Sequence, residues 1–279
     1  MKKKIRDKWI IHALNTALKA GTAILEVYEM SDQGISLKED LSPITLADRR
    51  SDTIIKNMLR TTDIPVFTEE SSNVPYEIRK TWDQYWLVDP LDGTKEFIHH
   101  YDEFTVNIAL IEEGVPVFGV IYVPVYRQLY FAIKERGAYR IENIIETFSD
   151  NTELSNILDH AIRLPDRTHA GIHVVVSRSH MSSETKAYIG EKLGDEPFKI
   201  VSAGSSLKFC RVAEGEADLY PRLGPTMEWD IAAGIVIVTE AGGTVRQYDG
   251  KPLLFNRENL LNPWFVVASE EITKNIILK

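Results

Sequence analysis

The hydrophobic pattern of the first hundred residues predicts two helices followed by buried strands. Apolar residues recur every three or four positions over residues 8–30 and 46–59, which is the period of an amphipathic helix. Residues 65–67 form a short apolar run, and residues 85–88 are almost continuously apolar. Short runs of this kind are typical of strands that are buried on both faces.

From residue 104 the pattern indicates consecutive strands. Turn signals such as Glu113-Gly114 and Arg136-Gly137 separate four β-like segments and predict an antiparallel meander. These segments are residues 104–111, 115–123, 128–133 and 138–141. Residues 142–168 are polar and irregular, which predicts a domain junction.

The second half of the chain alternates between strand and helix patterns. Predicted strands cover residues 172–176, 198–201, 217–220 and 265–268, and predicted helices cover residues 182–193, 205–214 and 231–241. Such alternation favours an α/β layer. We therefore expect an α/β fold with an N-terminal α+β domain over residues 1–150 and a C-terminal α/β domain over residues 151–279.

Composition narrows the classes of function. With 279 residues the chain can bury a large core, and its net charge of −9 disfavours a polynucleotide groove, which needs a basic face. Cys210 is the only cysteine, so no intrachain disulfide can form, and its place in a predicted helix indicates core packing. We expect a cytoplasmic protein without a membrane-spanning helix. The basic start Met1-Lys4 leaves a peripheral contact with the inner membrane face open, although a solvated helix end is the favoured explanation.

Residues 86–97 combine a buried strand with groups that suit a metal and a phosphate. Asp89, the Leu91 carbonyl and Asp92 at the end of an apolar strand can converge on a hard divalent cation. Gly93 and Thr94 can offer backbone N–H groups and a hydroxyl to a phosphate oxygen. A loop aspartate followed by a helix cap is the alternative interpretation.

Two further acidic segments favour the metal interpretation. Glu69 and Glu70 follow the strand that ends near Phe67, and we expect Glu69 to be a metal ligand and Glu70 to be supporting or exposed. Asp230 lies at the start of a predicted helix, where it is either a capping residue or a ligand for a second metal. The small residues 232–234 allow that helix to pack closely against another backbone.

Several polar residues are candidates for catalysis and substrate binding. Asp48 and Thr94 together could orient and deprotonate a water molecule held by the metal, although Thr45 with Asp48 also matches a helix-start pattern. Ser205, Lys208 and Arg222 could contact a second phosphate. His180 is a weaker candidate for a ribose or base contact. Each of these also has an ordinary structural or surface explanation.

Together, these segments resemble the lithium-sensitive, magnesium-dependent phosphatases of the inositol monophosphatase superfamily. The hallmarks occur in order as Glu69-Glu70, Asp89 to Thr94 and Trp229 to Gly234. Lys95-Glu96 and residues 42–48 match the CysQ-type 3′(2′),5′-bisphosphate nucleotidases within it. The resemblance spans residues 38–245, and Thr68 departs from the Gly or Ser that often precedes the glutamates.

The resemblance implies a sandwich of alternating α and β layers with the site at the junction of two domains. It implies two or three Mg²⁺ ions, most ligands coming from the first domain and Asp230 from the second. The ligands would be Glu69, Asp89, the Leu91 carbonyl, Asp92 and Asp230. Gly93 and Thr94 would hold the scissile phosphate, Asp48 and Thr94 would activate water, and Ser205, Lys208, Arg222 and His180 would bind the nucleotide.

The implied reaction is hydrolysis of adenosine 3′,5′-bisphosphate to AMP and phosphate, an activity connected with sulfur metabolism. An inositol-phosphate or sugar-phosphate phosphatase on the same scaffold is one alternative. A non-catalytic sensor of phosphonucleotides or metal is another. The sequence leaves the oligomeric state and the resting number of metal ions open.

Overall fold

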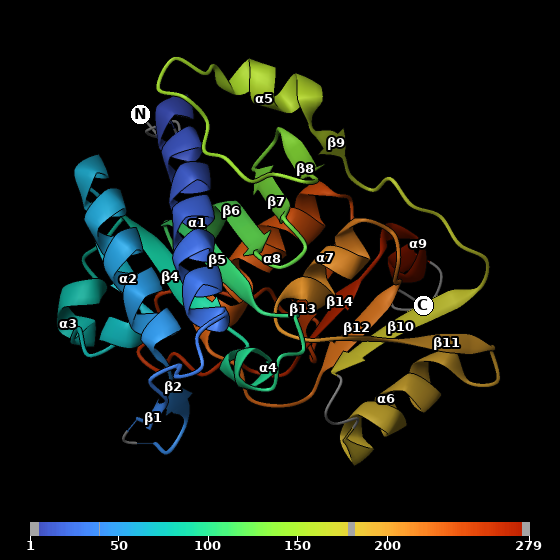
Figure 1. Cartoon of the computed structure of the whole chain (residues 1–279). Coiled ribbons are helices and arrows are strands. Elements are labelled where there is room, and N and C mark those ends of the chain that lie inside the picture. Colours follow the sequence, from blue (N-terminus) through green and yellow to red (C-terminus); the bar gives the residue numbers. More distant parts are fainter. Residues whose placement is uncertain (1–5, 39, 178–181, 275–279) are drawn as a thin grey trace.

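Helical and sheet layers alternate through the molecule. The computed structural model describes residues 6–38, 40–177 and 182–274, and Figure 1 shows two sheets separated by a helical layer. The first sheet has seven strands and the second has five. Helices also cover the outer faces of both sheets, so the order is α, β, α, β, α, as the layered α/β prediction requires.

The seven-stranded sheet runs β3-β4-β5-β6-β7-β8-β9. Only β3 pairs with its neighbour in parallel, and every later pairing is antiparallel, which confirms the predicted meander. The strands are β3 (Val66–Thr68), β4 (Gln84–Asp92), β5 (Thr105–Glu112), β6 (Val115–Val123), β7 (Gln128–Ile133), β8 (Gly137–Ile141) and β9 (Ile162–Arg163).

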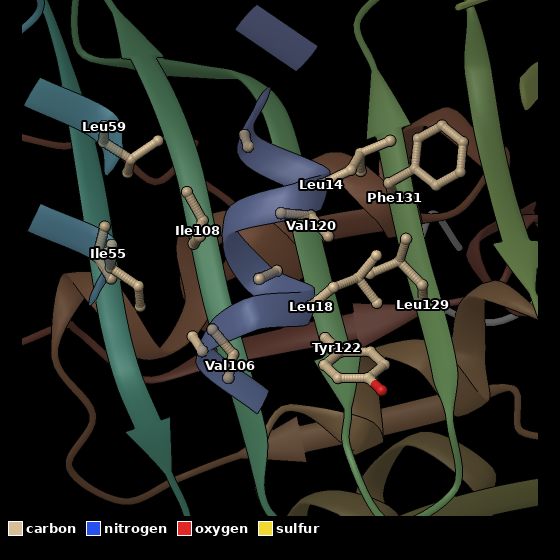
Figure 2. Close-up of a cluster of buried hydrophobic side chains, with 14 of the residues drawn as sticks. Leu14, Leu18, Ile55, Leu59, Val106, Ile108, Val120, Tyr122, Leu129 and Phe131 are labelled. Atoms are coloured by element: carbon tan, nitrogen blue, oxygen red, sulfur yellow. The ribbon is translucent and has the colours of Figure 1, made fainter. Parts of the chain in front are cut away.

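Two long helices cover the outer face of this sheet. Helix α1 (Asp7–Tyr28) and helix α2 (Leu46–Leu59) bury their apolar stripes against it, and Figure 2 shows Leu14 and Leu18 of α1 over β6 and β7. Helix α2 contributes Ile55 and Leu59, which are fully buried. The 3.6-residue period of these positions is the reason that one face of each helix meets the sheet.

The five-stranded sheet runs β11-β10-β12-β14-β13, with its first three strands parallel and the others antiparallel. These strands are β10 (Ile172–Ser177), β11 (Phe198–Ala203), β12 (Leu219–Arg222), β13 (Thr244–Gln247) and β14 (Phe265–Ala268). Helices α7 (Leu207–Ala213) and α8 (Glu228–Glu240) lie between the two sheets, and α6 (Ser183–Leu193) and α9 (Glu270–Ile272) cover the outer face.

The remaining elements are short. They are the pair β1 (Ser36–Leu37) and β2 (Pro43–Ile44), the 3₁₀ turns η1 (Arg60–Thr62) and η2 (Glu69–Ser71), and helices α3 (Tyr76–Arg79), α4 (Thr94–Ile98) and α5 (Leu154–His160). Helix α4 and turn η2 directly follow β4 and β3, so both begin at the same end of two paired strands. That end of the sheet carries the candidate chemistry.

The structure corrects some element boundaries. Residues 142–168 are not irregular throughout, because they contain α5 and the sheet strand β9. Helix α8 begins three residues earlier than predicted, at Glu228, and the predicted strand at residues 85–88 extends to Asp92. The division into domains at residue 150 stays a prediction.

Candidate active site

The end of β4 places Asp89 and Asp92 on either side of an irregularity in the sheet. Asp89 pairs with Asn107 of β5 and Asp92 with Thr105. Two residue steps on β5 therefore oppose three residue steps on β4, which defines a β-bulge. Leu91 lies within this bulge, and its N–H donates to Asp89 Oδ1 at 3.1 Å. Bulges next to active sites commonly redirect side chains or carbonyls. This one brings both aspartates to the same strand end.

Glu69 and Glu70 both face the ammonium group of Lys38. Lys38 Nζ donates to Glu69 Oε1 and to Glu70 Oε1, each at 2.7 Å. Of the two alternatives for Glu70, supporting or exposed, the structure excludes the exposed one, because the 3₁₀ turn η2 brings both side chains to one side and only 10% of the Glu70 side chain is exposed. Lys38 comes from the segment between β1 and β2, which places a cation beside the acidic cluster.

Asp230 reaches the same region from the layer between the sheets. It occupies the first turn of α8, and its Oδ2 accepts the Met227 N–H at 2.8 Å. The interpretation of Asp230 as a capping residue is thus correct for its Oδ2 atom. Next to it, Gly234 and Ala233 allow close packing, because a Cβ on Gly234 would lie 2.4 Å from the Phe209 ring. The small residues of this helix do permit the close approach that their sequence predicted.

The electrostatics of these carboxylates shows that they face one another. Burial raises the pKa of Asp89 well above its usual value, and repulsion from Glu69, Asp92 and Asp230 raises it further. Burial and repulsion from Asp92 likewise raise the pKa of Asp230. Mutual repulsion of this strength requires proximity, since it decays with distance. The fold therefore brings the four predicted carboxylate ligands to one partly buried, electronegative region, in which only Asp89 is almost completely buried.

This donor set fits a divalent cation that prefers oxygen. Among the residues described, no three His, Cys, Asp or Glu side chains already form a cage for one ion, because their oxygens face protein donors instead. Mg²⁺ does not require such a cage. It retains water molecules and binds through one or two carboxylates together with substrate phosphate. The excess of buried negative charge is what such an ion would neutralise.

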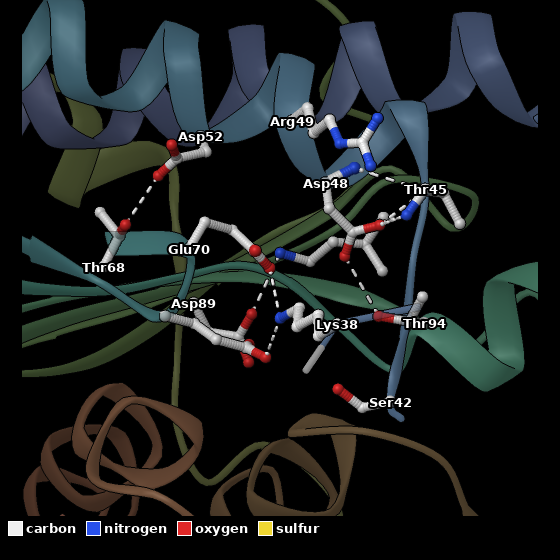
Figure 3. A network of polar contacts seen from close by, with 12 residues as sticks. Lys38, Ser42, Thr45, Asp48, Arg49, Asp52, Thr68, Glu70, Asp89 and Thr94 are labelled. Carbon is white, nitrogen blue, oxygen red and sulfur yellow. Dashed lines mark hydrogen bonds and ion pairs between the residues drawn. The ribbon is translucent and has the colours of Figure 1, made fainter. Parts of the chain in front are cut away.

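Asp48 and Thr94 form the contact that the sequence suggested, as Figure 3 shows. The Thr94 hydroxyl donates to Asp48 Oδ1 at 3.1 Å. Asp48 Oδ2 accepts both the N–H and the hydroxyl of Thr45, at 2.7 and 2.6 Å. The helix-start pattern is therefore also present, as a capping box. Burial outweighs these hydrogen bonds and raises the pKa of Asp48.

A second polar contact holds the Glu69 turn against α2. Thr68 donates its hydroxyl to Asp52 Oδ1 at 2.7 Å, and Asp52 Oδ2 accepts from Lys56 Nζ at the same distance. Ser51, also on α2, donates to the Pro90 carbonyl at 2.6 Å. One helix therefore positions both the turn after β3 and the end of β4. The unusual Thr68 has a structural purpose here, because a glycine could not make this hydrogen bond.

The start of α7 joins the second half of the chain to Asp92. The hydroxyl of Ser205 donates to Asp92 Oδ2 at 2.7 Å, and the hydroxyl of Ser206 lies 2.7 Å from the same oxygen. Ser206 Oγ is also 2.8 Å from the Asp230 carbonyl and from Asn107 Nδ2. This hydroxyl thus connects β4, β5 and α8 at the centre of the site.

Two cations lie beside these serines. Lys208 is only 6% exposed, and its Nζ donates to the Ser205 carbonyl at 2.5 Å. Arg222 at the end of β12 donates from Nη2 to the Pro225 carbonyl, while its buried Nε has no partner among the described residues. The buried, unpaired donor favours a role for Arg222 in binding an anion.

A cavity of about 180 Å³ unites the two halves of the site. Its lining includes Asp92, Gly93, Ser205, Lys208 and, from the helical layer, Asp230. Gly93 has a φ of +92°, and a Cβ there would lie 3.2 Å from that of Ser205, so the close approach of these two segments requires glycine. His180 lies outside the described residues.

Sequence reasoning missed four contributors to this site. Ser206, Asn107 and Lys38 contact candidate site residues, and Asp52 accepts from Thr68, the residue before Glu69. Ser206 and Lys38 lie in segments that the sequence had already singled out for their polar residues. The sequence alone gave no reason to prefer the hydroxyl of Ser206 to that of Ser205. Asn107 and Asp52 fall inside a strand and a helix, where only the folded contacts reveal them.

Comparisons with known proteins identify the family of the chain. The model of the inositol monophosphatase family matches residues 5–277. A protein of Salmonella typhimurium named 3′(2′),5′-bisphosphate nucleotidase CysQ is 46% identical over 90% of this chain and 96% of its own length, and the Haemophilus influenzae protein of that name is 32% identical over 93% and 94%.

Solved structures give the same result. The crystal structure of CysQ from Bacteroides thetaiotaomicron has a TM-score of 0.85 and 45% identity, and covers 93% of this chain and 96% of that one. The suppressor protein SuhB from Bartonella henselae has a TM-score of 0.73 and 28% identity, with 94% of both chains covered. The chain belongs to the inositol monophosphatase family.

Proposed function

We propose that the protein is a 3′(2′),5′-bisphosphate nucleotidase that hydrolyses adenosine 3′,5′-bisphosphate to AMP and inorganic phosphate. Relatives carrying that name are 45–46% identical over 90% of the chain. The observation that carries the proposal is the convergence of four carboxylates, buried or partly buried, next to a cavity that also contains Lys208 and Arg222. The carboxylates can hold metal ions for the phosphate that reacts, and the neighbouring cations can bind a second phosphate of the substrate.

The carboxylates would hold the metal ions. We assign Glu69, Asp89, the Leu91 carbonyl, Asp92 and Asp230 as ligands of two or three Mg²⁺ ions. When bound, Mg²⁺ supplies neutralisation of phosphate charge and a lower pKa for water. A negative charge on any of these side chains disfavours charge on the others, so bound cations would also stabilise the folded site.

Asp48 and Thr94 would accept the proton from the attacking water. Thr94 commits its single hydroxyl hydrogen to Asp48 Oδ1, which leaves the Thr94 oxygen as an acceptor. A water molecule that donates a hydrogen bond to the Thr94 oxygen directs its own lone pairs away from that oxygen. Thr45 keeps Asp48 in place through two hydrogen bonds to the other carboxylate oxygen. Direct attack then needs no covalent intermediate with the protein.

The substrate phosphates would bind on both sides of Asp92. We assign Gly93 and Thr94 to the scissile phosphate, and Ser205, Lys208 and Arg222 to the second phosphate. The buried Nε of Arg222, unpaired within the described residues, supports this assignment, because a phosphate oxygen would satisfy it. His180 stays a prediction.

Substitution of Asp89 tests the metal site. We expect Asp89→Asn to reduce Mg²⁺-dependent phosphate release by at least about a hundredfold, because the change removes a charge at the centre of the cluster. Asp249→Asn on an exposed turn is the matched control and should leave the rate unchanged. Phosphate release by Asp89→Asn at near the wild-type rate would refute the metal assignment.

A substrate panel separates the proposed activity from that of related phosphatases. Adenosine 3′,5′-bisphosphate, inositol 1-phosphate and fructose 1,6-bisphosphate should be compared with and without Mg²⁺ and Li⁺. We expect the nucleotide to have the highest kcat/KM, because Lys208 and Arg222 lie where a second phosphate would bind. Preference for inositol 1-phosphate would instead support an inositol phosphatase on this scaffold, and tight binding without turnover would support a sensor.

The structure also bears on whether the protein could cross a membrane. Within residues 6–38, 40–177 and 182–274, no helix has both the length and the apolar character needed to cross a bilayer. The cytoplasmic location and the peripheral membrane contact stay predictions.

A further inference from the structure

A second cavity adjoins the one that contains Asp92. It has a volume of about 570 Å³ and shares the residues Glu96, Ser177, Tyr220 and Arg222 with the smaller cavity. Its lining contains none of the carboxylates that we assign to metal ions. The larger cavity is therefore placed to hold the part of the substrate that does not react.

One wall of this cavity is aromatic. His99 and Tyr101, which follow α4, both line it, and their rings are stacked with centroids 5.6 Å apart and planes inclined by 29°. Both residues are exposed, and 47% of the Tyr101 surface is accessible. Exposed aromatic rings at the mouth of a site offer flat surfaces for a ligand at little entropic cost.

The other lining residues suit a nucleotide. Val176 and Leu223 supply apolar surface from the second sheet and from the segment after β12. Lys95 and Arg222 provide two positive charges, whereas Glu96 is the only acidic side chain among the described residues of the lining. A flat, apolar base attached to an anionic sugar phosphate matches this combination.

We propose that His99 and Tyr101 form a stacking surface for the nucleobase and determine the preference of the enzyme for nucleotides. This inference rests on the proposed function, which it deepens. Stacking depends on a π-face that every base possesses, so the pair detects that a base is present and not which base it is. Guanosine and adenosine 3′,5′-bisphosphates should therefore depend on these rings to a similar extent.

The test compares adenosine 3′,5′-bisphosphate with its abasic analogue, 1-deoxyribose 3,5-bisphosphate. In the double variant His99→Ala/Tyr101→Ala, we expect the ratio of kcat/KM values for the two substrates to fall about 5- to 150-fold, which corresponds to the usual contribution of one stacked base. The loss should appear in KM and not in kcat, because stacking binds the substrate and the transition state equally.

Two controls isolate the aromatic contribution. Tyr101→Phe keeps a ring and should retain the preference for the nucleotide. Tyr126→Ala removes an exposed tyrosine between β6 and β7, outside the cavity lining, and should leave both substrates unaffected. A double variant that keeps the wild-type ratio, or that loses both substrates equally, overturns the inference.

Calorimetric binding of AMP with Mg²⁺ present separates this inference from the proposed function. We expect the double variant to bind AMP about 5- to 150-fold more weakly than the wild type. A wild-type protein that binds AMP through these rings but does not hydrolyse the bisphosphate would refute the proposed function and support the stacking surface. Equal AMP affinity in both proteins would overturn the stacking surface, even where hydrolysis is observed.

Discussion

Lys208 shows how burial adjusts one side chain at the site. Removal from water lowers the pKa of its ammonium group to about 8, and Arg222 adds to this lowering, whereas Asp92 acts in the opposite direction. Lys208 therefore loses its charge within the range where enzymes are usually assayed. A group that titrates there makes anion binding depend on pH.

The pH dependence of kcat/KM tests this state of Lys208. The charged form is present below pH 8 and is lost as the pH rises, so we expect kcat/KM for adenosine 3′,5′-bisphosphate to fall about tenfold between pH 7 and pH 9. Lys208→Arg remains charged throughout and should give a flatter profile above pH 8. A wild-type profile as flat as that of the arginine variant would contradict this role.

The position of α8 depends on one glycine of the sheet. A Cβ on Gly119 of β6 would lie 2.5 Å from the Ala233 carbonyl oxygen and 2.7 Å from the Ala233 Cα. Because both atoms belong to the helix backbone, the clash cannot be relieved by rotating a side chain. Gly119 thus permits α8 to lie directly on the sheet, which in turn positions Asp230.

Substitution at this contact should destabilise the protein. We expect Gly119→Ala to lower the free energy of unfolding by about 1–3 kcal/mol, the usual cost of overpacking a core. Gly190→Ala is the matched control, because nothing lies within 4 Å of its added Cβ and alanine favours the helix. Urea denaturation measures both. Equal stability of the two variants would show that α8 can move away from β6 at little cost.

At the scale of the whole molecule, a buried ionic network ties the first sheet to the helical layer. Glu214, after α7, is fully buried and contacts Arg140 of β8 at 2.5 Å and Arg211 of α7 at 2.8 Å. Arg140 also pairs with Asp166 in the segment that leads to the second sheet. The network therefore connects the first sheet, the connecting segment and the helical layer.

Loss of the central carboxylate should affect the entire fold. We expect Glu214→Gln to lower the free energy of unfolding by about 3 kcal/mol, because Arg140, Arg211 and Arg167 lose their shared buried partner. Glu142→Gln removes a half-exposed partner of Arg140 and should cost less than about 1 kcal/mol. Denaturant midpoints provide the comparison. Similar midpoints for both variants would show that Asp166 alone satisfies Arg140.

The sequence predicted the elements with strong periodicity. Helix α2 and strands β6, β7 and β14 have the predicted limits, because their apolar residues keep one period from end to end. Strand β13 was missed because Val245 is its only buried residue, and α5 because only Leu154 and Ile157 are buried. Such weak patterns become ordered through tertiary contacts.

The same distinction applies to the site. The place of Asp89 and Asp92 at a strand end and the contact of Asp48 with Thr94 could be predicted because each of these residues lies in a recognisable segment, whereas their roles stay predictions. The link from Ser206 to Asp92 joins residues 114 positions apart, and no local pattern encodes it. Lys38 was unpredictable for the same reason, since its two partners lie more than thirty positions away.

The two adjoining cavities have a consequence for how this scaffold diversifies. The groups that we assign to hydrolysis lie in strand ends and helix starts of the core, whereas His99, Tyr101 and the residues after β12 belong to peripheral connections. Mutations in those connections can exchange one leaving group for another while the reaction itself is preserved. New substrates are therefore accessible to such an enzyme through small changes at its rim, without an inactive evolutionary intermediate.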